Sequence, residues 1–243
     1  MAKEIPLNER IIFALDVSNK AEAEQWVKTL EAHTRFFKVG LQLFLGAGFG
    51  MVEWILQRDL KVFLDLKFFD VPETVKLAVR ALTNRGVTFA TVHGNDAMLR
   101  AAAEAAVGVR ILAVTALTSL DEADMRDLGF ECSVKNLVLS RARRALQIGC
   151  HGVIASGLEA PILRKELGEH FLVVTPGIRP VSNMDDQKRT VDVRQAFEDG
   201  ADYIVVGRPV REASDPVAVV KGMQAEIQSV FSSREGTWRK RNG

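Results

Sequence analysis

The stretch KVFLDLKFFDVPETVKLAVRALTNRG, residues 61–86, decides the fold. It opens with a short apolar run, KVFLDLK (61–67), and continues into an amphipathic pattern, PETVKLAVRALTNRG (72–86), which ends at a glycine as helices commonly do. A strand followed by a helix is the repeating unit of a parallel sheet covered by helices. The same unit recurs along the rest of the chain.

Eight strand candidates precede helical patterns in this way, and their starts lie about 27 residues apart on average, which suits the units of a (β/α)8 barrel. They are IIFALDV (11–17), FFKVG (36–40), KVFLDLK (61–67), FATVH (89–93), RILAVTAL (110–117), HGVIAS (151–156), FLVVTPG (171–177) and YIVVGR (203–208). The longest interval contains DEADMRDLGFECS (121–133), for which we expect a short extra helix. We predict an α/β fold, a single-domain TIM barrel over residues 1–233; an open doubly wound sheet is the alternative, because periodicity does not show closure.

Composition narrows the classes of function. The 243 residues hold 32 Lys and Arg against 31 Asp and Glu, a net charge of +1, which argues against a nucleic-acid partner. No apolar run reaches the roughly 18–20 residues of a membrane span, and the N-terminus lacks a secretory h-region, so we expect a cytoplasmic protein without a membrane partner. The basic segment 234–243 is expected to be a disordered tail.

The two cysteines, Cys132 and Cys150, form no CxxC pair and have no histidine at ligand spacing. We expect two buried, reduced thiols, and neither a disulfide nor a metal site.

Side chains alternate between the two faces of a strand, so parity predicts which residues point into the barrel. In 61–67 the interior set is Phe63, Asp65 and Lys67, and the same alternation places Asp16 and Lys38 on the interior side of their strands. These charges stand at or near the carboxyl ends of the strands, where barrel enzymes carry their chemistry.

Asp65, Lys67, Asp70 and Lys38 therefore predict a cluster of alternating carboxylates and ammonium groups. A single Asp–Lys pair would favour a structural salt bridge. Several converging charges instead favour a functional site, because a barrel built only for stability would have Val or Ile at these positions.

A second group of residues follows the last two predicted strands. TPGIR (175–179) places Gly177 and Arg179 after one strand, and VVGRP (205–209) places Gly207 and Arg208 after the next. Loops at these positions form the recurrent phosphate site of such barrels, although a Gly-Arg turn that merely caps the barrel is the alternative. His93 ends another strand and could act as an acid or base; a hydrogen-bonded structural role is favoured.

The segment DLKFFDVPET (65–74) resembles the D-x-K-x-x-D-[IV]-P-x-T motif of the bacterial orotidine 5'-phosphate decarboxylase family. The resemblance extends over nearly the whole chain, through FALDV (13–17), FKVGLQLF (37–44), VTALTS (114–119), VTPGIRP (174–180) and DYIVVGRPV (202–210). It implies an enzyme without metal or cofactor that converts orotidine 5'-phosphate to UMP and CO2, the last step of UMP synthesis.

Carried over residue by residue, the resemblance implies that Asp16 and Lys38 hold the ribose hydroxyls. Lys67 would be the proton donor, in a charged network with Lys38, Asp65 and Asp70.

The resemblance also implies contacts to the rest of the substrate and to a second subunit. Thr118 would contact the pyrimidine, and the 5'-phosphate would be bound by Arg179, Gln187, Gly207 and Arg208, with Gln187 also bridging to the base. Asp70 and Thr74 would reach into the partner's site, so a homodimer is expected.

Two alternatives stay open at this point. A magnesium-dependent sugar-phosphate decarboxylase or synthase, such as 3-keto-gulonate 6-phosphate decarboxylase or hexulose-phosphate synthase, shares the D-x-K-x-x-D pattern, but the continuation Val71-Pro72-x-Thr74 argues against it. A non-catalytic barrel that binds a phosphorylated ligand would be expected to lack a Lys or Asp of the cluster, and all are present.

Overall fold

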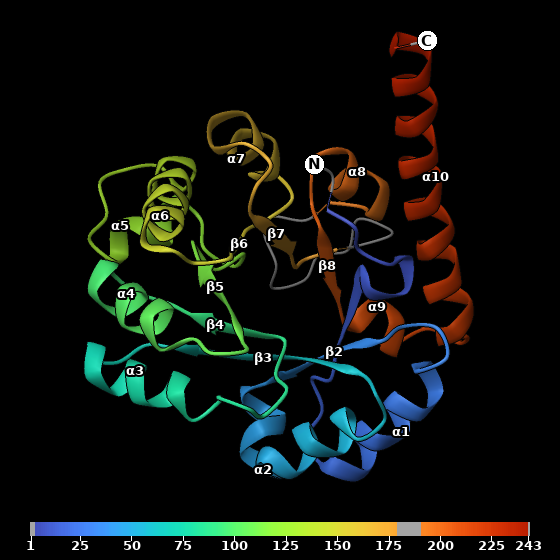
Figure 1. Ribbon diagram of the computed structural model, residues 1–243, viewed down its shortest axis with the longest axis horizontal. Coiled ribbons are helices and arrows are strands. Elements are labelled where there is room, and N and C mark those ends of the chain that lie inside the picture. The colour runs from blue at the N-terminus through green and yellow to red at the C-terminus, as the bar shows by residue number, and fades with distance from the viewer. Residues whose placement is uncertain (1–2, 179–190, 243) are drawn as a thin grey trace.

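The computed structural model describes residues 3–178 and 191–242, with side chains up to Ser233. Within that part of the chain, eight parallel strands pair in sequence order and β8 pairs back onto β1, so the sheet closes (Figure 1). The predicted TIM barrel is confirmed, and the open sheet is excluded. The strands are β1 (Ile11–Ala14), β2 (Phe36–Gly40), β3 (Lys61–Phe68), β4 (Phe89–Val92), β5 (Arg110–Val114), β6 (Gly152–Ile154), β7 (Leu172–Thr175) and β8 (Tyr203–Val206).

Helices surround the barrel, and all of the described ones except the first and the last two connect consecutive strands (Figure 1). They are the 3-10 turn η1 (Leu7–Glu9) and the α-helices α1 (Lys20–Leu30), α2 (Leu41–Leu56), α3 (Pro72–Arg80), α4 (Asp96–Ala105), α5 (Glu122–Asp127), α6 (Val134–Ile148), α7 (Ala160–Leu167), α8 (Val193–Glu198), α9 (Arg208–Arg211) and α10 (Pro216–Asn242).

The expected extra helix before the long α6 is α5, which begins with a capping box. The Asp121 side chain accepts from the backbone of Ala123 and Asp124, while the Asp124 carboxylate accepts from the Asp121 N–H. Helix α6 in turn begins at the N-cap Ser133 and ends at Gly149, whose φ of 106° a side chain would strain.

The two faces of the strands bury different sets of apolar residues, as parity predicts. Val62 and Leu64 of β3 pack outward beneath the helices, whereas Phe63 points into the barrel. The barrel interior is filled mainly by residues of this second kind: Ile12, Ala14, Phe36, Phe63, Phe89, Leu112, Val114, Ile154, Leu172, Val174, Tyr203 and Val205.

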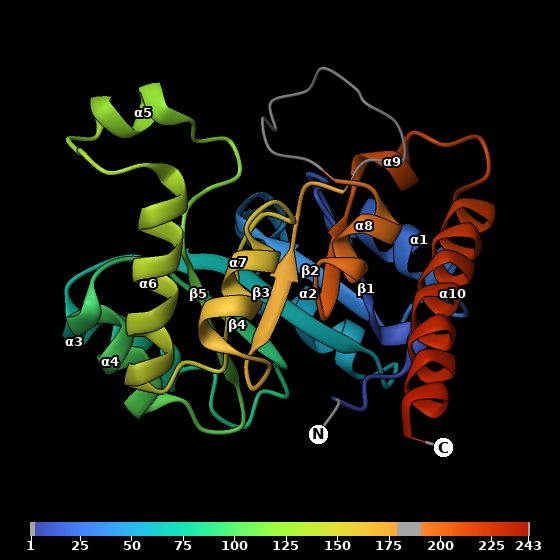
Figure 2. The ribbon, with the colours of Figure 1, turned by 90° about the horizontal axis from the view of Figure 1, so that it is seen from above.

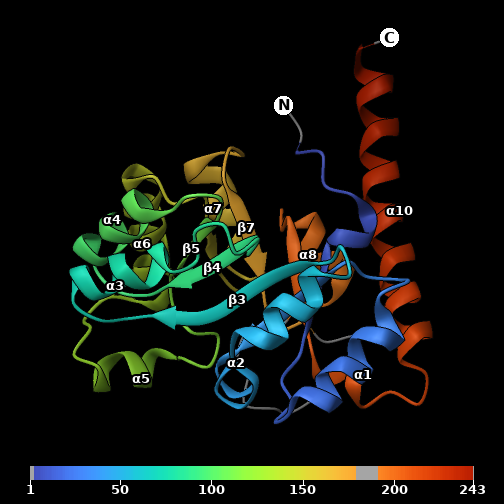
Figure 3. The same ribbon diagram turned by 60° about the horizontal axis from the view of Figure 1, so that its bottom comes forward.

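Strand ends and the tail differ from the sequence-based expectation. Strands β1, β5 and β7 end two or three residues before the apolar runs do, because those residues leave the ladder to form the rim of the barrel. Helix α10 extends to Asn242 along one side of the barrel, so residues 234–242 are helical where the sequence predicts a disordered tail (Figure 3). Extending a helix that has already formed is far easier than starting one.

The carboxyl ends of the strands meet at one end of the molecule. Figure 2 shows α5, which follows β5, and α9, which follows β8, at that same end. Over residues 3–178 and 191–242, no helix is both long and apolar enough to cross a membrane.

Candidate active site

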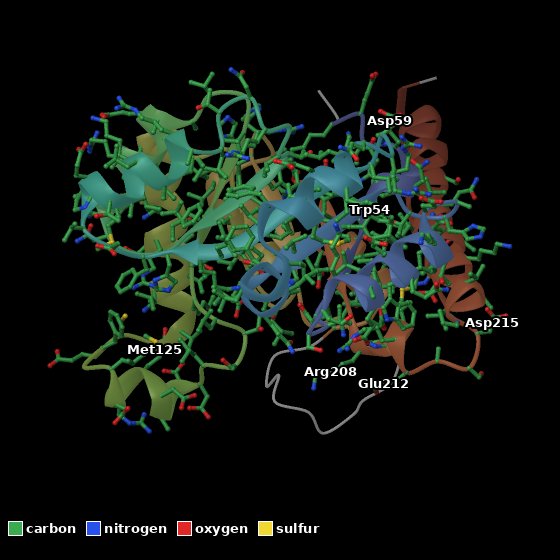
Figure 4. The ribbon with its side chains drawn as sticks, turned by 90° about the horizontal axis from the view of Figure 1, so that it is seen from below. Trp54, Asp59, Met125, Arg208, Glu212 and Asp215 are labelled. Atoms are coloured by element: carbon green, nitrogen blue, oxygen red, sulfur yellow. The ribbon has the colours of Figure 1, made fainter. Side chains whose placement is uncertain are left out.

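A cavity of about 240 Å³ opens at the carboxyl ends of the strands, near the lower limit of volumes typical of small-molecule sites. Figure 4 shows Arg208 near the edge of the molecule where Met125 of α5 lies, and Asp59, which precedes β3, at the opposite edge. The described lining of the cavity includes eight of the residues predicted for the site: Asp16, Lys38, Asp65, Lys67, Thr118, Gly177, Gly207 and Arg208.

Charged side chains from β2, β3 and the segment directly after β1 form a continuous network on one wall of this cavity. Lys38 Nζ lies 2.8 Å from Asp16 Oδ1 and 3.6 Å from Asp65 Oδ2. Lys67 Nζ donates to Asp65 Oδ1 at 2.9 Å. The strand register places Lys38 directly opposite Ala14 on β1 and Phe63 on β3, which explains how charges far apart in sequence meet.

Burial and neighbouring charges shift the pKa values in this network in opposite directions, and the effect of the charges is the larger. Burial alone would lower the pKa of Lys38, but the carboxylates of Asp65 and Asp16 raise it above its ordinary value. Burial would raise the pKa of Asp65, but the charges of Lys38 and Lys67 lower it, helped by hydrogen bonds from Lys67 and Thr91. Both residues of the buried pair are therefore charged at neutral pH.

Lys67 occupies an irregular part of β3. Its φ of +49° is in the left-handed region, which a side chain occupies only at a cost of about 1–2 kcal/mol. The Lys67 backbone N–H donates to Thr91 Oγ1 at 2.9 Å, and Thr91 Oγ1 donates to Asp65 Oδ1 at 2.9 Å. No motif in the sequence singles out Thr91, although its position two residues after Phe89 on β4 places it on the interior face.

Two glycines leave room for the carboxylate of Asp16. A Cβ at Gly40 would lie 3.1 Å from Lys38 Nζ and 3.4 Å from Asp16 Oδ1, and one at Gly207 would lie 3.5 Å from Asp16 Oδ2. A side chain at Gly40 would thus press directly on the Asp16–Lys38 ion pair.

The structure describes some of the residues predicted to bind the phosphate. Gly177, Gly207 and Arg208 line the cavity, and they follow β7 and β8, which pair with each other. Arg179 and Gln187 lie outside the described residues. Fork-shaped guanidinium donors next to glycine backbone are a suitable receptor for a phosphate.

Asp70 and Thr74 do not join the cavity lining or the charged network of their own chain. Both are exposed, since β3 ends at Phe68 and the chain turns outward before α3. Asp70 Oδ1 accepts from the backbone N–H of Val71 at 2.6 Å. The four-residue cluster expected from the sequence is therefore assembled from Lys38, Asp65 and Lys67, with Asp16 in place of Asp70.

Other candidate residues have different surroundings. The ring of His93 contacts Phe69 edge-on, with centroids 5.4 Å apart. Burial, Arg141 and Lys67 lower the pKa of His93, so it is neutral at physiological pH.

Cys150 is buried but Cys132 is exposed, so the expectation of two buried thiols is wrong. Cys132 lies in the turn before α6, where the backbone runs along the surface.

A family model described as "Orotidine 5'-phosphate decarboxylase / HUMPS family" matches residues 9–223, most of the chain. The chain belongs to this family. Orotidine 5'-phosphate decarboxylase of Methylococcus capsulatus (strain Bath) is 58% identical over 234 residues, covering 95% of this chain and 97% of its own length.

Other members of the orotidine 5'-phosphate decarboxylase / HUMPS family agree in sequence and in fold. The enzyme of that name from Stenotrophomonas maltophilia is 46% identical, covering 93% of this chain and 96% of its own length. The crystal structure of orotidine 5'-phosphate decarboxylase from Lactobacillus acidophilus superimposes with a TM-score of 0.80 at 36% identity, covering 90% of this chain and 98% of that one.

Proposed function

We propose that this protein removes CO2 from orotidine 5'-phosphate to form UMP, the last step of de novo UMP synthesis. The observation that carries the proposal is the buried Lys38–Asp65–Lys67 network at the wall of a small cavity that Arg208 also lines. Relatives at 46–58% identity bear the name of this activity.

The reaction requires stabilisation of a difficult intermediate. Loss of CO2 from C6 of the pyrimidine leaves an electron pair in an sp2 orbital, and the ring offers no conjugated electron sink for it. Electrostatic stabilisation by a fixed positive charge is then the main means available. In our proposal the Lys67 ammonium lies beside C6, stabilises the developing charge, and donates a proton to C6 as the C–C bond breaks.

Asp65 has two effects in this scheme. Its carboxylate accepts from Lys67 Nζ and so fixes the position of the ammonium group. Next to the substrate carboxylate it would also repel a like charge, and this repulsion is relieved when neutral CO2 leaves. Lys38 compensates the buried charge of Asp65 from the other side.

Groups far from the reacting carbon would supply binding energy. We assign the 5'-phosphate to Arg208 and the backbone of Gly207, together with Arg179 and Gln187, which lie outside the described residues. Asp16 and Lys38 would hold the ribose hydroxyls, and Thr118 the pyrimidine. Binding energy from a phosphate that does not react can be used to orient the ring against Lys67.

A homodimer is also part of the proposal. The segment that carries Asp70 and Thr74 exposes three large apolar side chains, Phe69, Val71 and Leu77, each more than half accessible. Exposed apolar groups this close together indicate a protein contact surface. A second copy of the chain is the partner proposed, since its site would receive Asp70 and Thr74.

Absorbance measurements on the purified full chain test the activity. Orotidine 5'-phosphate and UMP differ in ultraviolet absorbance, so turnover appears as a change on addition of enzyme, and we expect the same rate with and without EDTA. Turnover of 3-keto-gulonate 6-phosphate instead, lost on chelation, would contradict the proposal and favour a magnesium-dependent relative.

The substrate and product are highly charged phosphate esters that do not cross bilayers unaided. We therefore propose the cytoplasm as the site of action, which fractionation of the source cells would test.

A further inference from the structure

The irregularity in β3 lies beside a single residue of β4. Leu64 pairs with Ala90 and Phe68 with Val92, so residues 65–67 stand opposite Thr91 alone. Two extra residues on one strand interrupt the ladder and leave backbone groups without their regular partners. The inserted stretch contains Asp65 and Lys67, the two residues to which the proposed chemistry assigns the largest effects.

The Thr91 hydroxyl forms hydrogen bonds where the backbone ladder between β3 and β4 is interrupted. As an acceptor it binds the Lys67 backbone N–H, and as a donor it binds Asp65 Oδ1, each at 2.9 Å. A hydroxyl has one proton to donate, and here it is directed at the carboxylate oxygen that also accepts from Lys67 Nζ. Thr91 Oγ1 thus binds both the main chain of Lys67 and the carboxylate of Asp65, which in turn orients the Lys67 ammonium group.

Thr91 is well suited to hold these groups rigidly. It is fully buried and lies behind the cavity wall, outside the described lining. Its β-branched side chain has restricted rotation and is at home on a strand. The hydrogen bond it accepts also offsets the cost of the positive φ at Lys67, from which an unheld backbone would tend to relax.

We propose that Thr91 is a positioning residue of the active site: its hydroxyl fixes the separation and direction of Lys67 and Asp65 without touching the substrate. This inference rests on the proposed function, and it adds a residue that acts only through its neighbours. Misplacement of a catalytic group by about 1 Å can cost about 100-fold in rate.

Two substitutions at this site test the inference. Thr91→Val keeps the shape and removes the hydroxyl, and we expect kcat to fall about 10- to 100-fold while KM changes little. Thr91→Ser restores the hydroxyl and should recover most of kcat.

Thr34→Val is the matched control. Thr34 is also fully buried, but its hydroxyl donates to the Ile11 carbonyl at 2.6 Å, at the amino-terminal end of β2 and away from the cavity. The Thr34→Val variant should have lower thermal stability than the wild type and the same kcat. A Thr91→Val variant with wild-type kcat would overturn the inference, and so would a Thr91→Ser variant as slow as Thr91→Val. If Thr91→Val does not fold, Thr91→Cys takes its place, because a thiol forms only weak hydrogen bonds.

Crystal structures separate this inference from the proposed function. If the wild-type protein did not decarboxylate orotidine 5'-phosphate, the proposed function would fail, yet the structure of Thr91→Val would still decide the inference. We expect the Lys67 backbone to leave its positive φ, or the Asp65 carboxylate to rotate away from Lys67 Nζ. Unchanged positions of both residues would overturn it.

Discussion

Lys67 is the residue on which the proposed chemistry depends most directly. Lys67→Ala removes both the charge beside C6 and the proton donor, so we expect kcat to fall by more than about 10³-fold. The protein should still fold, because the side chain is partly exposed at the cavity and only Asp65 pairs with it among the described residues. Steady-state turnover and circular dichroism measure the two effects.

Lys28→Ala, which removes an exposed lysine of α1, is the control and should keep wild-type turnover. A Lys67→Ala variant with a rate near that of the wild type would contradict the assignment of the proton donor.

Arg208 is expected to act on the phosphate and not on the ring. A hydrogen bond to a charged group contributes about 1.5–3 kcal/mol, so Arg208→Ala should weaken UMP binding about 10- to 100-fold. Affinity for uridine, which has no phosphate, should be unchanged. Calorimetry with both ligands gives the comparison, with Arg144→Ala, an exposed arginine of α6, as control. Equal losses for UMP and uridine would argue against a phosphate contact.

The two cysteines should differ in reactivity. Burial raises the pKa of Cys150 to about 12, so only about 10⁻⁴ of it is thiolate at pH 8, whereas Cys132 is exposed. We expect a disulfide reagent such as DTNB to label one thiol of the native protein quickly and the second only after unfolding. Cys132→Ser should abolish the fast reaction; a fast thiol that persists in this variant would contradict the burial of Cys150.

At the scale of elements, Asp202 links α7, β7 and β8 at the amino-terminal end of the barrel. Its carboxylate accepts from Arg164 at 2.8 Å, from Lys3 at 2.7 Å and from the Val173 N–H at 2.9 Å. The Arg164 side chain is only 8% exposed, and removal of Asp202 leaves its buried charge with the exposed Glu169, at 3.4 Å, as its remaining carboxylate partner among the described residues. Asp202→Ala should therefore lower the free energy of unfolding by about 3–5 kcal/mol.

Because Asp202 lies at the end of the barrel opposite the cavity, kcat of Asp202→Ala at 25 °C should match that of the wild type. Glu53→Ala breaks an exposed ion pair with Arg85 and should cost less than about 1 kcal/mol. Urea unfolding compares the three proteins, and an Asp202→Ala variant no less stable than Glu53→Ala would refute the prediction.

At the scale of the whole molecule, the exposed apolar segment 69–77 predicts self-association. Leu77→Lys places a charge on this surface, so we expect sedimentation to shift from dimer to monomer and kcat to fall as Asp70 and Thr74 leave the neighbouring site. Val107→Lys, an equally exposed position before β5 at the opposite end of the barrel, should change neither. A wild-type protein that sediments as an active monomer would contradict this prediction.

The local pattern of apolar and polar residues is sufficient to predict much of the architecture. The spacing of apolar runs predicts all eight strands, and parity correctly directs Phe63 and Asp65 inward, because both predictions depend only on the alternation of neighbouring side chains. Lys67 also lines the cavity, although it lies in the bulge and has a positive φ. Strand ends are predicted less accurately, since Leu15 and Val17 are apolar although β1 ends at Ala14.

The sequence by itself therefore determined the order of strands and helices, the family, and the charges that face the interior, since these follow from periodicity and from a specific motif. Only the tertiary structure decided that the sheet closes, that Asp16 rather than Asp70 joins the network of its own chain, and that Thr91 supports Lys67. Closure, register and a bulge depend on hydrogen bonds between strands far apart in the chain, and such pairings leave no local pattern.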